Sequence, residues 1–377
     1  MRHLFKGATS LLSPPPFIFL LSLFLIASCQ KNASDSDGSG FDSQTNQSLK
    51  ESKSLKDFTQ VNLVGNNDEY DPVRIDPLLI NGWGIAFSPG GTIWISAQGT
   101  GVSVVYNKDG NQQLAPVSIP SPGAATGGNP TGQVFNGGAG FRLPNGNPAR
   151  FIFDGLDGVV SGWNGGTAAI RMIHSPGSVF TGMAIARDGN NDFIYLANFS
   201  QGRFDVYDTA WHLVNKPFMD PNIPAGFAPF NIQTVDGKLY VMYAKQAIGP
   251  AESGPGLGFV SIFNPDGSFV KRFVSRGQLN APWGVAKAPP SFWGDSPMTN
   301  VILVGNFGDG RINAFDENGN FLGQLRAHGE PIVIERLWAI SFAPTTATTI
   351  NPNWLYFAAG PDDEVDGLFG YITKQVE

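Results

Sequence analysis

A short motif that returns six times predicts an all-β fold, a six-bladed β-propeller with four-stranded antiparallel blades. The motif is a small-residue start that leads into an apolar stretch, and its returns lie about 50 residues apart. The six returns are anchored at Gly84, Gly132, Gly182, Asn231, Gly284 and Ala339. The 47 glycines and 28 prolines among 377 residues suit a fold with many tight turns. Two β-sandwiches would explain the strands, but not the regular return of the motif.

The first residues have the pattern of an export signal. A basic start precedes an apolar run over 17–26, which is too short to span a bilayer. Small residues then precede Cys29, as in the bacterial lipobox, whose cysteine is acylated after cleavage. Cys29 is the chain's only cysteine, so disulfides within the chain are excluded. We expect residues 1–28 to be a lipoprotein signal peptide and Cys29 to be lipidated; a plain signal peptide with a chance cysteine is the alternative.

The segment after the signal is polar. Residues 29–56 are rich in Ser, Asp, Asn, Gln and Lys, so they cannot bury a core and should form a flexible tether. The propeller then occupies 57–377. Gln30, where an Asp would favour the inner membrane, points to the outer membrane or surface of a Gram-negative bacterium. The net charge of −7 and the lack of a basic patch argue against nucleic acid as a partner.

The strands of the six units follow in order along the chain. Their clearest stretches are 83–87, 92–95 and 102–106 in blade one, 151–153 and 159–163 in blade two, 193–198 and 203–208 in blade three, 239–243 and 259–263 in blade four, 301–306 and 311–316 in blade five, and 355–357 and 368–372 in blade six. Blade six shows no stretch for a fourth strand. Residues 59–64 precede blade one, and we expect them to close the ring as the outer strand of blade six, which removes an open sheet edge.

Several stretches of the chain resemble known families. The segment 303–319 resembles the NHL repeat, and the region 58–373 resembles a family of bacterial exported proteins, many of which carry a PEP-CTERM sorting tail. The stretches that carry this second resemblance are Asn81–Pro89, Ala149–Phe153, Pro224–Gln233, Asn306–Phe315 and Ala359–Glu364. The chain departs from that family in having a lipobox and no sorting tail. The resemblance implies a propeller fold and export, and it implies no particular activity.

The candidate ligand site lies where two sets of loops share one face of the propeller. The start motifs and the loops between second and third strands should meet at one mouth of the central channel. Aromatic walls with a few polar groups are typical of small-molecule or carbohydrate sites. The candidate ligand-binding residues are Trp83, Phe230, Trp283, Trp338 and Gln98. The alternative is that the aromatic side chains fill the channel and the polar residues hold tight turns.

The same loops could hold a metal ion. Carboxylate and amide oxygens are the ligands that Ca²⁺ prefers, and the candidates are Asp157, Asn198, Asn306 and Asp309. No cofactor is implied otherwise. His174 and His328 precede start motifs, so a catalytic base at the mouth is a further alternative to two solvated loop histidines.

Three function classes follow from this sequence. The first is an exported, lipid-anchored propeller that binds a small molecule, a carbohydrate or an envelope protein without catalysis. The second is a Ca²⁺-dependent hydrolase or lyase that acts from the channel mouth. The third is a structural subunit of a surface assembly. The sequence favours binding over catalysis, because no motif of a known nucleophile or metalloprotease is present.

Overall fold

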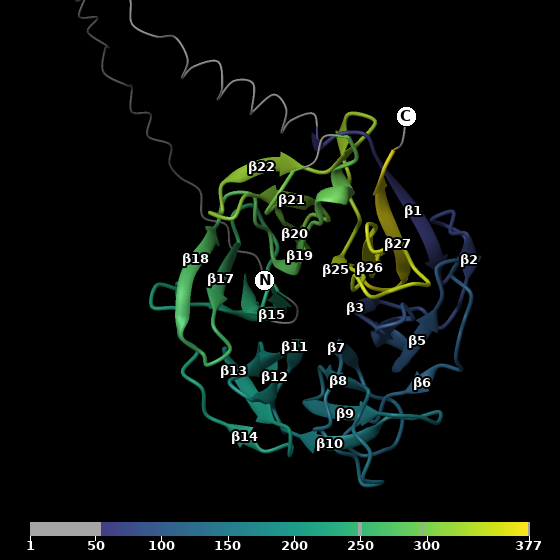
Figure 1. The fold of residues 1–377 in the computed structure, drawn as a ribbon, viewed down its shortest axis with the longest axis vertical. Helices are drawn as coiled ribbons and strands as arrows, with labels where there is room; N and C mark the ends of the chain where they lie inside the picture. Colours follow the sequence, from purple (N-terminus) through teal and green to yellow (C-terminus); the bar gives the residue numbers. More distant parts are fainter. Residues whose placement is uncertain (1–53, 248–250, 296–297, 376–377) are drawn as a thin grey trace, which may run out of the picture. The chain divides into compact units, whose positions relative to one another are not determined.

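Six sheets are arranged as blades around a central axis in the computed structural model (Figure 1). The structure describes residues 54–247, 251–295 and 298–375. The predicted signal peptide and lipidation site at Cys29 lie outside these residues, as does the predicted tether up to residue 53. Leu55, near the end of that tether, is buried and packs into the core of the ring.

Five of the blades are antiparallel meanders of four consecutive strands, with the first strand innermost. Blade one contains β3 (Gly82–Phe87), β4 (Ile93–Ala97), β5 (Val102–Tyr106) and β6 (Val117–Ser118). Blade two contains β7 (Pro130–Phe135), β8 (Phe151–Gly155), β9 (Val159–Trp163) and β10 (Ile170–His174). Blade three contains β11 (Phe180–Asp188), β12 (Asn191–Asn198), β13 (Arg203–Asp208) and β14 (Leu213–Val214).

The remaining blades continue around the ring. Blade four contains β15 (Phe227–Val235), β16 (Lys238–Lys245), β17 (Gly258–Phe263) and β18 (Phe269–Ser275). Blade five contains β19 (Pro282–Lys287), β20 (Ile302–Asn306), β21 (Ile312–Phe315) and β22 (Phe321–Gln324). Blade six contains β25 (Leu337–Phe342), β26 (Leu355–Ala359) and β27 (Leu368–Lys374). Short elements outside the blades are η1 (Gln98–Thr100), η2 (Pro290–Trp293), β23 (Arg326–Ala327) and β24 (Glu330–Pro331).

The ring is closed by the N-terminal strand, as the sequence predicted. Strand β1 (Phe58–Gly65) pairs antiparallel with β27 and so forms the fourth strand of blade six, with β2 (Arg74–Ile75) added in parallel beyond it. Figure 1 shows β1 beside β27, although they lie at opposite ends of the chain. The six-bladed fold and its closure are therefore confirmed, and the alternative of two β-sandwiches is excluded.

The repeated small residues have a steric reason. A Cβ added at Gly84 would lie 2.6 Å from the carbonyl oxygen of Thr131 on the next inner strand, and one at Gly132 would lie 2.5 Å from the amide nitrogen of Met183. These distances are too short for a side chain, so the inner strands approach each other closely around the axis only because these positions are glycine. A register shift interrupts the pairing of each inner strand near its small residue. The motif that identified the repeat is thus the packing element of the axis.

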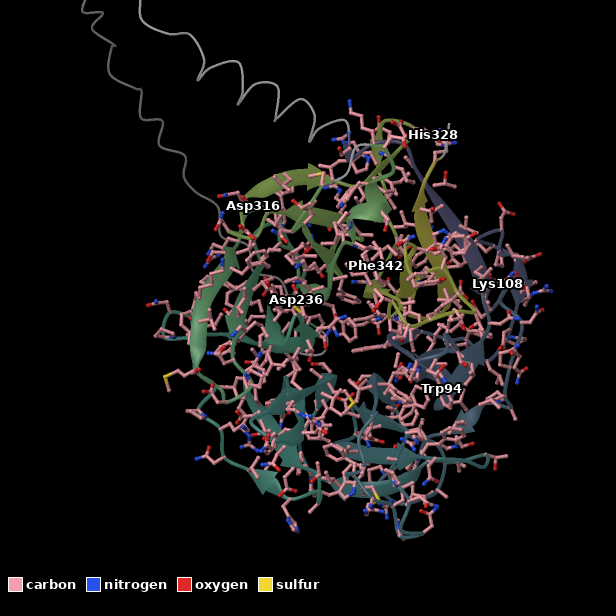
Figure 2. The ribbon with its side chains drawn as sticks, viewed as in Figure 1. Trp94, Lys108, Asp236, Asp316, His328 and Phe342 are labelled. Carbon is pink, nitrogen blue, oxygen red and sulfur yellow. The ribbon has the colours of Figure 1, made fainter. Side chains whose placement is uncertain are left out.

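The structure favours solvated histidines over the alternative of a catalytic base at the mouth, because both predicted candidates are exposed. His174 ends β10, the outer strand of blade two, and is exposed. His328 lies in the exposed turn between β23 and β24, at the outer edge of the ring in Figure 2.

Among the described residues, no helix is long and apolar enough to cross a lipid bilayer.

Candidate functional site

Six buried aromatic side chains close one end of the axial channel. They come from five blades and are Trp83, Phe199, Phe230, Trp283, Phe307 and Trp338. The Trp338 ring lies at the centre of the cluster, with its centroid 3.4 Å from that of Trp83 and 4.1 Å from that of Phe307. Rings from so many blades can meet only at the axis. This aromatic plug therefore fills the channel at the end where the inner strands begin.

The plug contains four of the residues predicted to bind a ligand. Trp83 and Trp283 meet edge to face at 6.2 Å, and Phe230 lies 5.7 Å from Trp338, so each ring is in contact with another member of the plug. The indole nitrogen of Trp283 donates to the carbonyl oxygen of Thr181 across the channel, at 2.8 Å. The geometry brings the four together as expected, and their burial favours the alternative in which they fill the channel. A role in ligand binding stays a prediction.

Gln98, the fifth predicted ligand residue, belongs to a chain of hydrogen bonds above the plug. Asn81 is its centre: the Nδ2 group donates to Gln98 Oε1 at 3.0 Å and to Glu364 Oε2 at 2.9 Å. Asn81 Oδ1 accepts from the indole nitrogen of Trp338 at 2.9 Å, and Gln98 Nε2 donates to Asn129 Oδ1 at 3.1 Å. This network links blades one, two and six at the plugged end.

An unusual backbone segment holds Glu364 over this network. Asp362, Asp363 and Glu364 have φ values of 52, 50 and 73°, three consecutive left-handed residues without a glycine. Each such conformation costs free energy. The turn is supported from outside by an ion pair between Arg336 and Asp363, while the Arg336 guanidinium lies 4.9 Å from the centre of the Phe307 ring.

The environment of Glu364 predicts a pH dependence of stability. Burial raises the pKa of Glu364, and Asp363 adds to this, whereas the hydrogen bond from Asn81 and the charge of Arg336 act against it. A carboxyl group whose folded pKa is raised stabilises the fold below its unfolded pKa, and that contribution is lost as pH rises through the folded value. We therefore expect Glu364→Gln to gain stability over wild type as pH rises from 4 to 8, measured by urea unfolding. The exposed control Glu330→Gln should show the same pH dependence of the free energy of unfolding as wild type. If Glu364→Gln showed that dependence too, the raised pKa of Glu364 would be contradicted.

Of the predicted metal ligands, only the two in blade five contact each other. Asn306 donates from Nδ2 to Asp309 Oδ1 at 3.0 Å within blade five. Asn198 in blade three donates to Ser178 Oγ at 2.9 Å and to Asp205 Oδ2 at 2.7 Å. Asp157 in blade two accepts at Oδ1 from the Val159 amide at 3.3 Å. No contact joins the blade-five pair to the other two within the ranges that the structure describes. Within those ranges, no three His, Cys, Asp or Glu side chains are grouped so that they could hold a metal ion.

A cavity of about 320 Å³ opens at the other end of the axial channel. Its walls include the last residues of three inner strands, Phe87, Phe135 and Phe342, and Trp283 of the plug also lines it. Figure 2 shows Phe342 near the centre of the ring. A second hollow, of about 430 Å³, shares Phe135 with the cavity. The axial cavity lies in the size range of small-molecule sites.

The cavity walls are apolar and carry no charge. The described residues that line the cavity include no Asp, Glu, Lys, Arg or His, and their polar groups are chiefly the amides of Gln133, Asn231 and Gln233. Gln133 is held on both sides: Nε2 donates to the carbonyl of Gly84 at 2.7 Å, and Oε1 accepts from Ser103 at 3.0 Å. Sequence reasoning missed the two glutamines, although an amide inside a buried strand is a signal for them.

Two viral proteins are similar to the chain over most of its length. "Uncharacterized protein L690" of Acanthamoeba polyphaga mimivirus is 35% identical over 334 residues, which cover 84% of this chain and 86% of the relative. "Uncharacterized protein R648" of the same virus is 34% identical over 334 residues, covering 84% and 80%. No protein-family model matches the chain.

Solved structures share the fold at low sequence identity. The soluble aldose sugar dehydrogenase from Escherichia coli, in its apo-form, superposes with a TM-score of 0.51 at 14% identity, covering 84% of this chain and all of that structure. At this identity the likeness shows the propeller fold alone.

These findings correct the expected family. The resemblance to bacterial exported proteins with PEP-CTERM tails, and to NHL repeats, is wrong as an assignment, because the relatives found are proteins of a giant amoebal virus and no family model matches. One stretch behind that resemblance, Asn81–Pro89, contains Gly84, which allows the close approach of inner strands at the axis of this propeller. The chain belongs to the protein family that includes L690 and R648 of Acanthamoeba polyphaga mimivirus.

Proposed function

We propose that this protein is a binding module that takes up a small, neutral and mainly apolar molecule in the axial cavity. The observation that carries the proposal is the cavity itself, which combines about 320 Å³ of space with uncharged, mostly apolar walls. Gln233 gives such a molecule one polar contact: its Oε1 accepts from the Val285 amide at 3.2 Å, which leaves Nε2 to donate to a bound acceptor.

The cavity chemistry favours binding over catalysis. Its hydroxyl groups belong to Thr234 and Ser341, and each donates to a backbone carbonyl, of Ile185 at 2.8 Å and Phe342 at 3.3 Å. Among the described lining residues there is no histidine or carboxylate to act as a base for either hydroxyl. A bound molecule would therefore be held without being attacked.

The test uses a neutral probe and its charged counterpart on the full-length protein. N-phenyl-1-naphthylamine is expected to bind with a fluorescence increase, and the sulfonate 1-anilinonaphthalene-8-sulfonate is expected to bind at least tenfold more weakly. Ser341→Phe, which fills the cavity from its wall, should weaken binding of the neutral probe at least tenfold.

The control is Ser291→Phe, in a groove of about 640 Å³ at another place on the surface. It should bind the neutral probe as wild type does. Equal binding by the Ser341→Phe variant, or preference for the sulfonate, would overturn the proposal. Both variants are first checked for folding by far-ultraviolet circular dichroism.

We also propose that the module is exported and anchored through Cys29, on the strength of the sequence pattern around that residue. The mass of the N-terminal peptide from protein made in a Gram-negative host tests this. An acylated peptide that begins at residue 29 is the expected result, and an unmodified Cys29 would refute it.

A further inference from the structure

Asp154 is a buried carboxylate at a position that the other blades fill differently. It is the penultimate residue of β8, and its side chain is 1% exposed. The residues at the same register in blades one, three, five and six are small: Ser96, Ala197, Gly305 and Ala358. One oxygen of Asp154 is well satisfied, since Oδ1 accepts from the Thr131 hydroxyl at 2.9 Å and from the Gly132 amide at 2.6 Å.

The second oxygen of Asp154 has no partner. Within the part of the chain that the structure describes, Asp154 Oδ2 is buried without a hydrogen bond, and so is Oδ2 of Asp157, three residues further along in the turn after β8. Neither carboxylate forms an ion pair with a cationic side chain among the residues that the structure describes. Burial, with a contribution from Asp157, raises the pKa of Asp154 to about 7, although the bonds from Thr131 and Gly132 oppose this.

The two unpartnered oxygens belong to carboxyl groups that act on each other electrostatically, and a positive partner would satisfy both. A buried carboxylate without a counter-charge is costly, and structures of native proteins leave few such groups without a reason. The two donors on Asp154 Oδ1 stabilise the ionised form of the group. The hydroxyl of Thr131 and the amide of Gly132 would stabilise a permanently neutral Asp154 less than an ionised one. A divalent cation supplies the missing charge, because its two positive charges balance two carboxylates.

We propose that Asp154 and Asp157 bind one hard divalent cation of the Ca²⁺ class through their unpartnered Oδ2 atoms. Hard cations prefer carboxylate oxygens and complete their coordination with water. Asp157 is half-buried as a residue although its Oδ2 is buried, so its turn lies between the solvent and the proposed ion. The site lies at the plugged end of the channel. Neither aspartate lines the axial cavity, although Gly132, which donates to Asp154 Oδ1, does. Cation binding does not require a ligand in the cavity. Of the residues predicted from sequence, it uses Asp157.

The experiment measures cation binding by the full-length protein after removal of metal with a chelator. Tb³⁺, a luminescent substitute for Ca²⁺, should show emission sensitised by the tryptophans of the plug. Ca²⁺ should displace it. At a Ca²⁺ concentration one hundred times its Kd, the unfolding equilibrium constant should fall about 100-fold.

Three variants of the same chemical change locate the site. Asp157→Asn and Asp154→Asn should lose the Tb³⁺ signal and the Ca²⁺ effect on unfolding, while Asp309→Asn, in blade five, should keep both. Asp157→Asn lies in a turn and keeps the test valid if the Asp154 variant fails to fold. Unchanged stability of the wild type with Ca²⁺, Mg²⁺ and Mn²⁺ would overturn the proposal, and would leave a proton shared by the two carboxylates as the explanation. Full cation binding by a folded Asp157→Asn variant would overturn it as well.

Discussion

Replacing Trp338 with alanine is expected to destabilise the folded protein by about 3–5 kcal/mol, the usual cost of removing a buried tryptophan. Trp338 is 1% exposed and lies at the centre of the aromatic plug, where it contacts Trp83 and Phe307. The change would remove these contacts and leave Asn81 Oδ1 without the donor that it now has in the Trp338 indole. Urea unfolding of both proteins, followed by circular dichroism, measures the difference.

Trp354→Ala is the matched control for this experiment. Trp354 is half-buried and stacks on Tyr371 away from the axis, with a distance of 3.9 Å between ring centroids. We expect it to cost clearly less than the Trp338 change, because less surface returns to water and no buried acceptor loses its donor. If the two variants lost the same free energy of unfolding, the plug would stabilise the ring no more than a half-buried ring pair away from the axis does.

Phe58→Ala is expected to produce a loss of similar size, about 3–5 kcal/mol, by loosening the closure of the ring. Phe58 is the first residue of β1 and is buried against η2: its ring stacks on Phe292 at 4.9 Å and meets Trp293 edge to face at 6.1 Å. The Lys374 ammonium of β27 lies 4.6 Å from the same ring. The variant removes the side chain that packs the first residue of the closing strand β1 against η2.

Thr59→Ala tests the specificity of that effect. Thr59 is the next residue of β1, is half-buried and pairs with Thr373. Its replacement keeps the backbone pairing and should cost less than about 1 kcal/mol. The closing-strand interpretation fails if Phe58→Ala and Thr59→Ala unfold at the same urea concentration as wild type.

The repeat was readable in the sequence because the same steric demand recurs at every blade. Close approach of the inner strands at Gly84 and Gly132 allows no side chain, so a small residue returns at each blade. The closing strand was readable for a related reason: one blade lacked a strand, and one stretch of the chain had no other partner. The small residue recurs with a fixed period, and the closing strand complements a blade that lacks one. Both kinds of pattern can be recognised in one sequence without other information.

The site was only partly readable. The loops predicted to share a face do share it, since Gln98 donates its backbone amide to the carbonyl of Asn81. The side chains at that face point inward and pack on one another, which the sequence does not show. Asp154 was missed because it stands in the strand Phe151–Gly155, and one acid within an apolar run gives no sign of what surrounds its second oxygen.

The sequence alone determined the fold class, the number of blades and the strand that closes them, because these depend on periodic spacing and on the size of single residues. Only the tertiary structure decided which end of the channel is open. Whether Trp83 and Trp338 form a wall around a ligand or a plug depends on the distances between blades that are far apart in the chain. At 3.4 Å between ring centroids, the two rings leave no room between them.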